Sequence, residues 1–195
     1  MRRLVLALLL IVVLAVGWVG VRGYLAKGHL DDAAGRLPTF EQQMGDLEVE
    51  AARTTLGQVQ DDTSAARDLT SDPVWRLLGA FPWGGQNLEA VGTATATIDD
   101  VVTGGLTGLV DAGDGLAAFR DGLSEGNLDG GGLADAGSGV ERLDTSLTQA
   151  REDLAAIDRR YLIDQVDAAV TELASSLDVA AQVGTRFGEQ LTEIG

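Results

Sequence analysis

Residues 4–21 read LVLALLLIVVLAVGWVGV and contain no charged side chain. About eighteen helical residues with a rise of about 1.5 Å each cover roughly 27 Å, just enough to cross the hydrocarbon core of a bilayer. Arg2 and Arg3 precede this stretch, and Trp18 and Tyr24 lie at its other end, where amphipathic rings favour a membrane interface. The sequence therefore predicts a single transmembrane helix at 4–21, in contact with the lipid bilayer.

The charges around this stretch predict its orientation. Cations lie on both sides, so the local positive-inside count is nearly balanced. Beyond Leu37, however, nine basic residues stand against 28 acidic ones. A short positive tail before a first apolar segment usually stays inside. We expect residues 1–3 to be a cytoplasmic tail and the body to be extracytoplasmic, which places the protein in the cell membrane as a single-pass protein.

A cleaved signal peptide is the alternative. Ala15-Val16-Gly17 offers the small residues at alternate positions that a signal peptidase requires, and two arginines form an ordinary n-region. The apolar run nevertheless continues through Val21, which is longer than a usual h-region and favours an uncleaved anchor. In both interpretations, the rest of the chain is exported from the cytoplasm.

The composition argues against several classes of partner and active site. The chain has a net charge of −16 and a pI near 4.2, which argues against a nucleic-acid partner because phosphate binding needs the opposite sign. It contains no cysteine and one histidine, His29, so no metal site built on clustered His or Cys is expected. The serines have no evident base partner, and no phosphate-binding glycine loop is present. We expect no enzyme activity, catalytic residue, metal or cofactor.

Apolar residues recur at spacings of three and four along most of the remaining chain, and no segment alternates like a strand. We expect an all-α protein in which a stalk, residues 22–38, leads into an antiparallel helical bundle with coiled-coil-like seams, residues 39–195. Pro38 suits the start of its first helix. The predicted helices cover about 39–69, 73–80, 87–119, 140–158 and 163–194.

Glycine marks the expected irregular segments. Several glycines between 104 and 115 each cost up to about 1 kcal/mol against alanine in a helix, so the helix is expected to bend or fray past Thr103. Residues 121–139 are Gly-rich and acidic without apolar periodicity, which predicts the main loop. Asn87 is the expected N-cap of the 87–119 helix.

Aromatic residues gather at one turn of an otherwise aromatic-poor chain. Asp72 and Pro73 suit the cap and first position of a short helix that follows residue 72. Large aromatics there can plug the end of a bundle, or they can line a groove for a ligand or partner. The residues of the possible groove are Trp75, Arg76, Phe81 and Trp83.

The string Ser71-Asp72-Pro73-Val74-Trp75-Arg76, together with Pro82-Trp83-Gly84-Gly85, resembles a specific family. It is similar to the N-terminal region of an actinobacterial membrane-anchored family catalogued as a domain of unknown function, number four thousand and twelve. The resemblance implies an extracytoplasmic protein of the cell envelope and no particular reaction. Members of that family continue into a further extracytoplasmic region, so the resemblance implies that this chain is a truncated member or a fragment.

Two functions follow as hypotheses. The first is a non-enzymatic scaffold or interaction module, whose helical body binds other envelope proteins or forms a homo-oligomer through its seams. The second is a sensor-type bundle, in which a ligand at the Trp-rich turn shifts helices connected to the membrane span. The three residues before the span offer no intracellular output, which favours the scaffold.

Overall fold

The computed structural model describes the backbone of residues 2–80, 84–126 and 130–194, and the side chains of 13–80, 84–126 and 130–182. This part of the chain is 89% helical and has no strands, which confirms the predicted all-α class. The helices are α1 (Arg2–Gly45), α2 (Val49–Thr70), α3 (Pro73–Gly79), α4 (Gly85–Asp100), the π-helix η1 (Val101–Leu106), α5 (Thr107–Ser124), α6 (Gly131–Ala155) and α7 (Asp164–Ile194).

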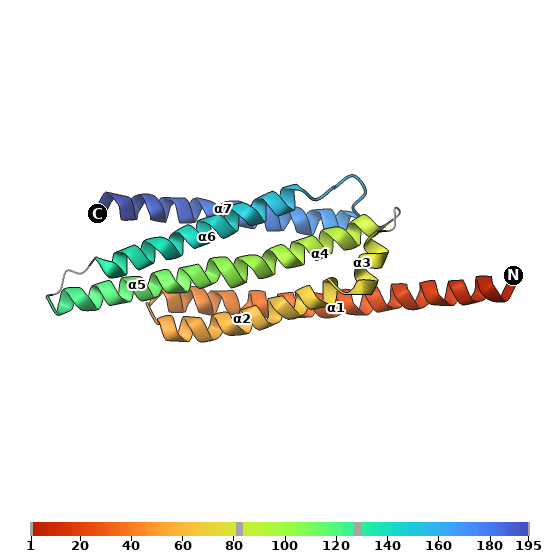
Figure 1. Cartoon of the computed structure of the whole chain (residues 1–195), viewed down its shortest axis with the longest axis horizontal. Helices are drawn as coiled ribbons and strands as arrows, with labels where there is room; N and C mark the ends of the chain where they lie inside the picture. Colours follow the sequence, from red (N-terminus) through yellow and green to blue (C-terminus); the bar gives the residue numbers. More distant parts are fainter. Residues whose placement is uncertain (1, 81–83, 127–129, 195) are drawn as a thin grey trace.

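A central helix divides the molecule into two layers (Figure 1). This central helix consists of α4, η1 and α5, which follow one another without a break. The pair α1 and α2 packs on one side of it, and the pair α6 and α7 packs on the other. Short α3 runs across one end and links α2 to α4. The helices form an elongated array in which the central helix serves two cores.

The first core lies between α1, α2 and the central helix. Its buried residues are Ala33, Phe40, Val49, Ala52, Leu56, Val59, Val102 and Val110. The second core lies between α6, α7 and the opposite side of the central helix. Its buried residues are Leu147, Ala150, Leu154 and Leu177, and Ala94 and Val101 pack against them.

The array exposes much of its surface. Its accessible area is 12,284 Å², whereas a compact monomer of the same mass would expose about 8,800 Å². The fold is thus a thin helical rod and not a globule. Alanine and valine make up most of the first core, whereas leucine makes up most of the second.

The first predicted helix boundary, at Pro38, is wrong. Pro38 lies inside α1, which continues to Gly45. A proline inside a helix loses one backbone hydrogen bond and costs about 3 kcal/mol, but Phe40 and Leu37 on the same helix pack into the first core. The chain turns after Gly45 instead, so the helix predicted at 39–69 is interrupted at 46–48 and α2 begins at Val49. At this turn Leu47 takes φ 56°, and the N–H of Glu48 donates to the carbonyl of Gln43 at 2.8 Å. This pattern is a Schellman ending of α1.

Residues 22–38, predicted as a stalk, belong to the body. Ala26 and Ala33 are buried, and α1 packs along α2 through this stretch. Arg36 and His29 both bind the carboxylate of Asp62 on α2, at 2.6 and 3.1 Å. The boundary between body and projecting helix therefore lies near residue 22, and not at residue 38.

The predicted break after Thr103 is a π-helix and not a frayed end. A π-turn leaves backbone carbonyls without their usual helical partners. The hydroxyl of Thr103 donates to the carbonyl of Asp99 at 2.7 Å, and the hydroxyl of Ser146 on α6 donates to that of Asp100 at 3.4 Å. Side chains from the same helix and from its neighbour thus bind the two carbonyls just before η1, and the helix continues into α5.

The predicted loop at 121–139 is too long, because α5 extends to Ser124 and α6 begins at Gly131. A β-carbon added at Gly108 of α5 would lie 2.6 Å from the carbonyl oxygen of Gly139 on α6. One added at Gly115 would lie 2.5 Å from that of Gly132. The two backbones touch where both helices have glycine, so this segment is helical because it packs through its backbone.

The remaining predicted helices correspond to observed ones. The helix predicted at 73–80 is α3, and the one predicted at 163–194 is α7. Gly84, at φ 113°, takes the N-cap position of α4 that Asn87 was expected to fill. Asn87 instead holds the α6–α7 loop, since it accepts from the N–H of Ile163 at 2.8 Å and donates to the carbonyl of Tyr161 at 3.3 Å.

Among the described residues, no helix is both long and apolar enough to cross a bilayer. The structure thus gives the predicted span at 4–21 no support. The side chains of residues 4–12, half of that stretch, lie outside the described residues.

The α5–α6 contact can be tested by its effect on stability. Gly139→Ala should lower the free energy of unfolding by about 1–3 kcal/mol, because the new methyl group would clash with the backbone of Gly108 and lie 2.7 Å from the nitrogen of Ala112. Urea unfolding followed by circular dichroism measures this change.

Gly137→Ala is the matched control on the same helix. Nothing lies within 4 Å of a β-carbon at Gly137, so alanine there should stabilise the protein by up to about 1 kcal/mol through helix propensity. Equal effects of the two substitutions would contradict the backbone contact.

Candidate functional site

The aromatic turn is built on a short helix with a strong cap. One oxygen of Asp72 accepts from the N–H groups of Val74 and Trp75, at 2.6 and 2.9 Å, and Pro73 occupies the first turn of α3. This confirms the cap predicted from the sequence. A capped first turn fixes the direction in which α3 crosses the end of the bundle.

Trp75 fills the space between α3, α1 and α4. Only 4% of its surface is exposed, and its indole N–H donates to the carbonyl of Leu88 at 2.8 Å. The ring lies beside Gly23 on α1 and Gly92 on α4, since a β-carbon on either would be in ordinary contact with it at 3.7 Å. Trp75 is therefore a packed plug at the end of the bundle, which agrees with the first of the two interpretations.

Arg22 fastens this end to α1. Its guanidinium donates to the carbonyls of Asp68 and Leu69, both at 2.9 Å, in the last turn of α2 where carbonyls lack helical partners. It also pairs with Asp72 at 2.9 Å and lies 5.3 Å from the ring centre of Trp18. One cation thus joins α1 to the end of α2 and to the start of α3.

The pKa of Asp72 is lowered from its ordinary value. Burial acts against this by favouring the neutral acid. The backbone N–H groups of Trp75 and Val74, the indole of Trp18 and the positive charge of Arg22 together outweigh burial. Asp72 is therefore a carboxylate that the fold both needs and stabilises in its charged form.

A groove of about 450 Å³ lies beside Trp75, between α3 and α4. Arg76 and Glu89 stand at this groove, and both are exposed. Of the four residues predicted to form a groove, the structure brings Trp75 and Arg76 together here. Phe81 and Trp83 lie outside the described residues.

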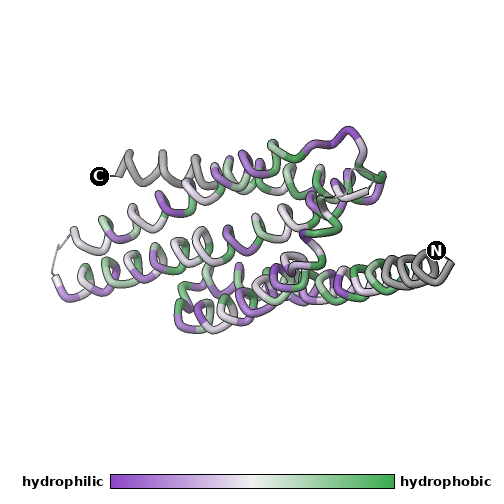
Figure 2. The backbone as a smooth tube through the Cα atoms, turned by 45° about the vertical axis from the view of Figure 1, so that its right-hand side comes forward, coloured by the Kyte–Doolittle hydropathy of each residue, from purple (hydrophilic) through white to green (hydrophobic). Residues whose placement is uncertain are grey.

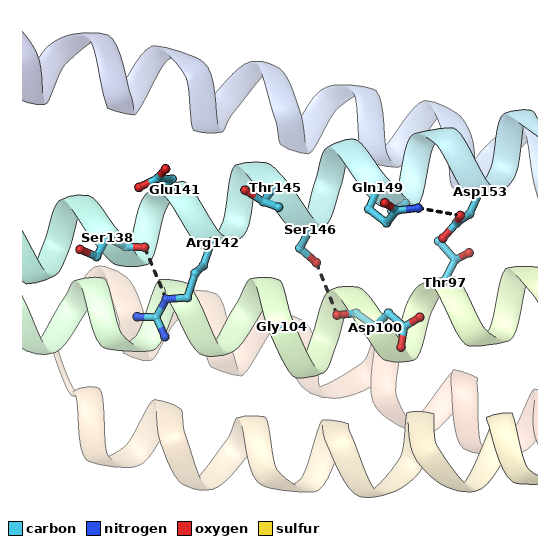
Figure 3. A pocket seen from close by; sticks show the side chains of 11 residues that line it. Thr97, Asp100, Gly104, Ser138, Glu141, Arg142, Thr145, Ser146, Gln149 and Asp153 are labelled. Carbon is cyan, nitrogen blue, oxygen red and sulfur yellow. Dashed lines mark hydrogen bonds between the residues drawn. The ribbon is translucent and has the colours of Figure 1, made fainter.

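A second groove, of about 490 Å³, runs between the central helix and α6 (Figure 3). Most of its lining residues have polar side chains, although the surface that they expose to the groove is largely apolar, and α6 supplies the greater part of them. The lining residues are Thr97, Asp100, Gly104, Ser138, Glu141, Arg142, Thr145, Ser146, Gln149, Ala150 and Asp153.

The two serine hydroxyls in this second groove donate to backbone carbonyls. Ser138 donates to the carbonyl of Ala134 at 3.0 Å, and Ser146 donates to that of Asp100 at 3.4 Å. A nucleophilic serine requires a base that accepts its proton. What the groove offers is a row of hydrogen-bonding groups for a polar partner, including the exposed Thr145 and Glu141.

A buried carboxylate lies on the other side of the central helix. Asp99 is 5% exposed and accepts from the hydroxyls of Thr63 and Ser64 on α2, at 2.9 and 2.8 Å. Arg67 pairs with it at 3.1 Å and with Asp100 at 2.6 Å, and hydrogen bonds to both carboxylates raise the pKa of Arg67. All the contacts named here are internal, so Asp99 locks α2 to the central helix just before η1.

His29 pairs with Asp62 on the α1–α2 side of the molecule, and not with its neighbours Asp31 or Asp32. Among the described residues, no group of three or more His, Cys, Asp or Glu side chains is arranged to hold a metal ion. The structure thus places the histidine in a helix-to-helix contact.

Sequence reasoning missed two contacts that shape the aromatic turn: the Arg22 contacts, and the Asn87 tether of the α6–α7 loop. Both join residues more than 45 positions apart. Such pairs leave no periodic signal in one sequence.

Comparison with known proteins gave no match: no family model, no curated protein and no solved structure resembles the chain significantly. The family resemblance inferred from residues 71–76 and 82–85 therefore rests on those residues alone.

Because the pKa of Asp72 is lowered, the contribution of this side chain to the free energy of unfolding should depend on pH. A carboxylate whose folded pKa lies below its unfolded value stabilises the fold above the unfolded pKa, near 4, and loses this contribution as the pH falls through the folded pKa. Asp72→Asn keeps a capping oxygen but removes the charge. It should cost up to about 1 kcal/mol at pH 7, and the difference from wild type should shrink below pH 4.

Asp72→Ala separates the cap from the charge. It should cost about 1 kcal/mol more than Asp72→Asn at both pH values, because it removes the acceptor for Val74 and Trp75. Urea unfolding at pH 7 and pH 3 gives these differences. A constant gap between wild type and Asp72→Asn would disprove the role of the charge.

The plug makes a second prediction at this turn. Trp75→Ala should lower the free energy of unfolding by about 3–5 kcal/mol because it empties a buried aromatic site. Arg76→Ala, at the exposed neighbouring position, should change it by less than about 0.5 kcal/mol. Thermal and urea melts check both values, and an unchanged stability of Trp75→Ala would favour a binding groove.

Proposed function

We propose that this chain is a non-enzymatic, membrane-anchored helical protein of the bacterial cell envelope that acts as a scaffold or interaction module. Residues 4–21 would cross the membrane with the N-terminus in the cytoplasm, and the acidic rod would stand on the extracytoplasmic side. The following observations support this proposal.

The continuity of α1 carries the proposal. One helix joins Phe40, which is 2% exposed in the first core, to the uncharged stretch at 4–21. Figures 1 and 2 show this helix extending beyond all the others towards the N-terminus. Of the large apolar side chains described on the extension, Val13, Leu14, Val16, Trp18 and Val21 are at least half exposed. Such a surface favours burial in lipid or protein over contact with water.

The polar groove of Figure 3 supports the interaction role. It lies along the rod, away from the aromatic turn, and presents hydroxyl, amide and charged groups from α6. Extracytoplasmic location in an actinobacterial envelope rests on the charge balance and on the motif at residues 71–76.

The groove beside Trp75 favours the sensor as second candidate. A ligand there would touch α3 and α4, and Trp75 contacts α1 near Gly23, the helix that leads to the proposed span. The fixed contacts of the indole weigh against this function, because its N–H is already bonded to Leu88.

Membrane retention tests the proposal. In cells, the full chain should stay in the membrane fraction after an alkaline carbonate wash, and Leu10→Arg with Leu14→Arg should release it, since each arginine near the centre of a span costs about 2.5–3.5 kcal/mol. Leu123→Arg, at an exposed position of α5, is the control and should be retained. Release of the wild-type chain would overturn the anchor.

Labelling tests the orientation. The chain has no cysteine, so Ser175→Cys on the exposed side of α7 gives a unique thiol. A membrane-impermeant maleimide should label it in intact cells. Labelling only after permeabilisation would contradict an extracytoplasmic body.

Site-specific photocrosslinking tests the interaction role. A photoreactive amino acid at Thr145 in the second groove should give a discrete adduct, either with another envelope protein or with a second copy of the chain. The same group at Ser175 is the control outside that groove. Equal background at both sites would count against a partner in the groove.

A further inference from the structure

We propose that the end of the bundle from which α1 emerges is a foot that rests in the lipid interface. The foot consists of Val74 and Leu77 on α3 and of Tyr161 and Ile163 in the α6–α7 loop. This inference rests on the proposed membrane anchor, and it adds a second lipid contact, made by the body itself.

The two segments of the foot meet at one end of the molecule. Asn87, at the start of α4, binds the backbone of both Tyr161 and Ile163. The same start of α4 receives α3, and Trp75 binds the carbonyl of Leu88 there. Figure 1 shows α3 and the α6–α7 loop together at the end from which α1 continues towards the N-terminus.

The apolar side chains of the foot face away from the bundle. Leu77 is 68% exposed and Val74 is 37% exposed, while Trp75 between them is buried. Positions 74 and 77 are three residues apart and share one helix face. Tyr161 and Ile163 are also more than half exposed. Of the large apolar residues that are exposed outside α1 in the described chain, Leu123 and Leu133 lie at the opposite end and Val179 lies on α7.

The geometry of α1 puts the foot at the correct height. Arg22 pairs with Asp72 at 2.9 Å and Gly23 lies beside Trp75, so α1 meets the α2–α3 corner directly after the stretch 4–21. That stretch would extend roughly 27 Å as a helix, close to the thickness of a hydrocarbon core. With residues 4–21 in a bilayer, α3 lies at the headgroup level, and it runs along the surface because it crosses the direction of α1.

The charges of the foot suit an interface. Arg76 is exposed on α3, where its cation can reach lipid phosphate. The nearby carboxylates of Asp72 and Asp158 are paired with Arg22 and Arg160, at 2.9 and 2.6 Å. Tyrosine and arginine beside aliphatic groups are typical of surfaces that lie in the plane of a membrane.

Fluorescence quenching in vesicles tests the foot. The full chain, carrying Leu77→Cys or Ile163→Cys with an environment-sensitive fluorophore, would be reconstituted into vesicles of phosphatidylcholine and phosphatidylglycerol. Leu123→Cys is the matched control, an exposed leucine at the far end of α5. Lipids with a nitroxide at headgroup depth should quench both foot labels several-fold more than the control, and a water-soluble quencher should show the reverse order.

The outcomes separate the foot from the anchor. Chains that float with the vesicles but leave all three labels equally accessible to water would overturn the foot and keep the anchor. Quenching at Leu77 without quenching at Ile163 would overturn the two-segment foot. Foot labels that are accessible in vesicles but protected in intact cells would assign the surface to a protein partner and overturn the proposal. Chains that fail to float would overturn both proposals.

Discussion

The contact between the backbones of α5 and α6 determines where α6 and α7 lie relative to the central helix. Gly108 and Gly115 on α5 meet Gly139 and Gly132 on α6 without any intervening side chain. This close approach brings α6 near enough for Leu147 and Leu154 to build the second core with α7. On its other side, the central helix uses larger residues, such as Val102 and Val110, to pack against α1 and α2. One helix thus supports two different kinds of packing.

The difference between these two contacts explains what the sequence could predict. The first core follows apolar spacing, and its helical character was predictable from it, although Pro38 misplaced the boundary. The α5–α6 contact depends on glycines, which single-sequence rules treat as breakers, so the end of α5 and the first turns of α6 were predicted as part of a loop at 121–139. Small residues at spacings of four and three, as at Gly132, Ala136 and Gly139, are a helical pattern. That spacing of small residues predicts the first turns of α6, although it carries no hydrophobic period.

The aromatic turn shows the same limit for a site. Asp72 and Pro73 were enough to predict the start of α3, because a helix cap involves only neighbouring residues. Trp75 is buried against α1 near Gly23 and against α4 near Gly92, two helices that are separate from α3 in the sequence. The sequence could therefore name the aromatic residue but could not decide between a plug and a groove. That decision required the positions of α1 and α4.

The charge distribution also bears on how the rod would be oriented on a membrane if the chain is anchored through α1. The central helix of Gly85–Ser124 is about 60 Å long at 1.5 Å per residue, while charges are screened within about 8 Å at physiological ionic strength. Most of the acidic rod would therefore not feel the surface potential of a membrane. Only the end near Arg22 and Arg76 would lie within its reach, and this end carries these two cations, the paired Asp72 and the exposed apolar side chains of the foot. The rod would then be held upright by contacts at its base, with its acidic length free to meet partners away from the lipid.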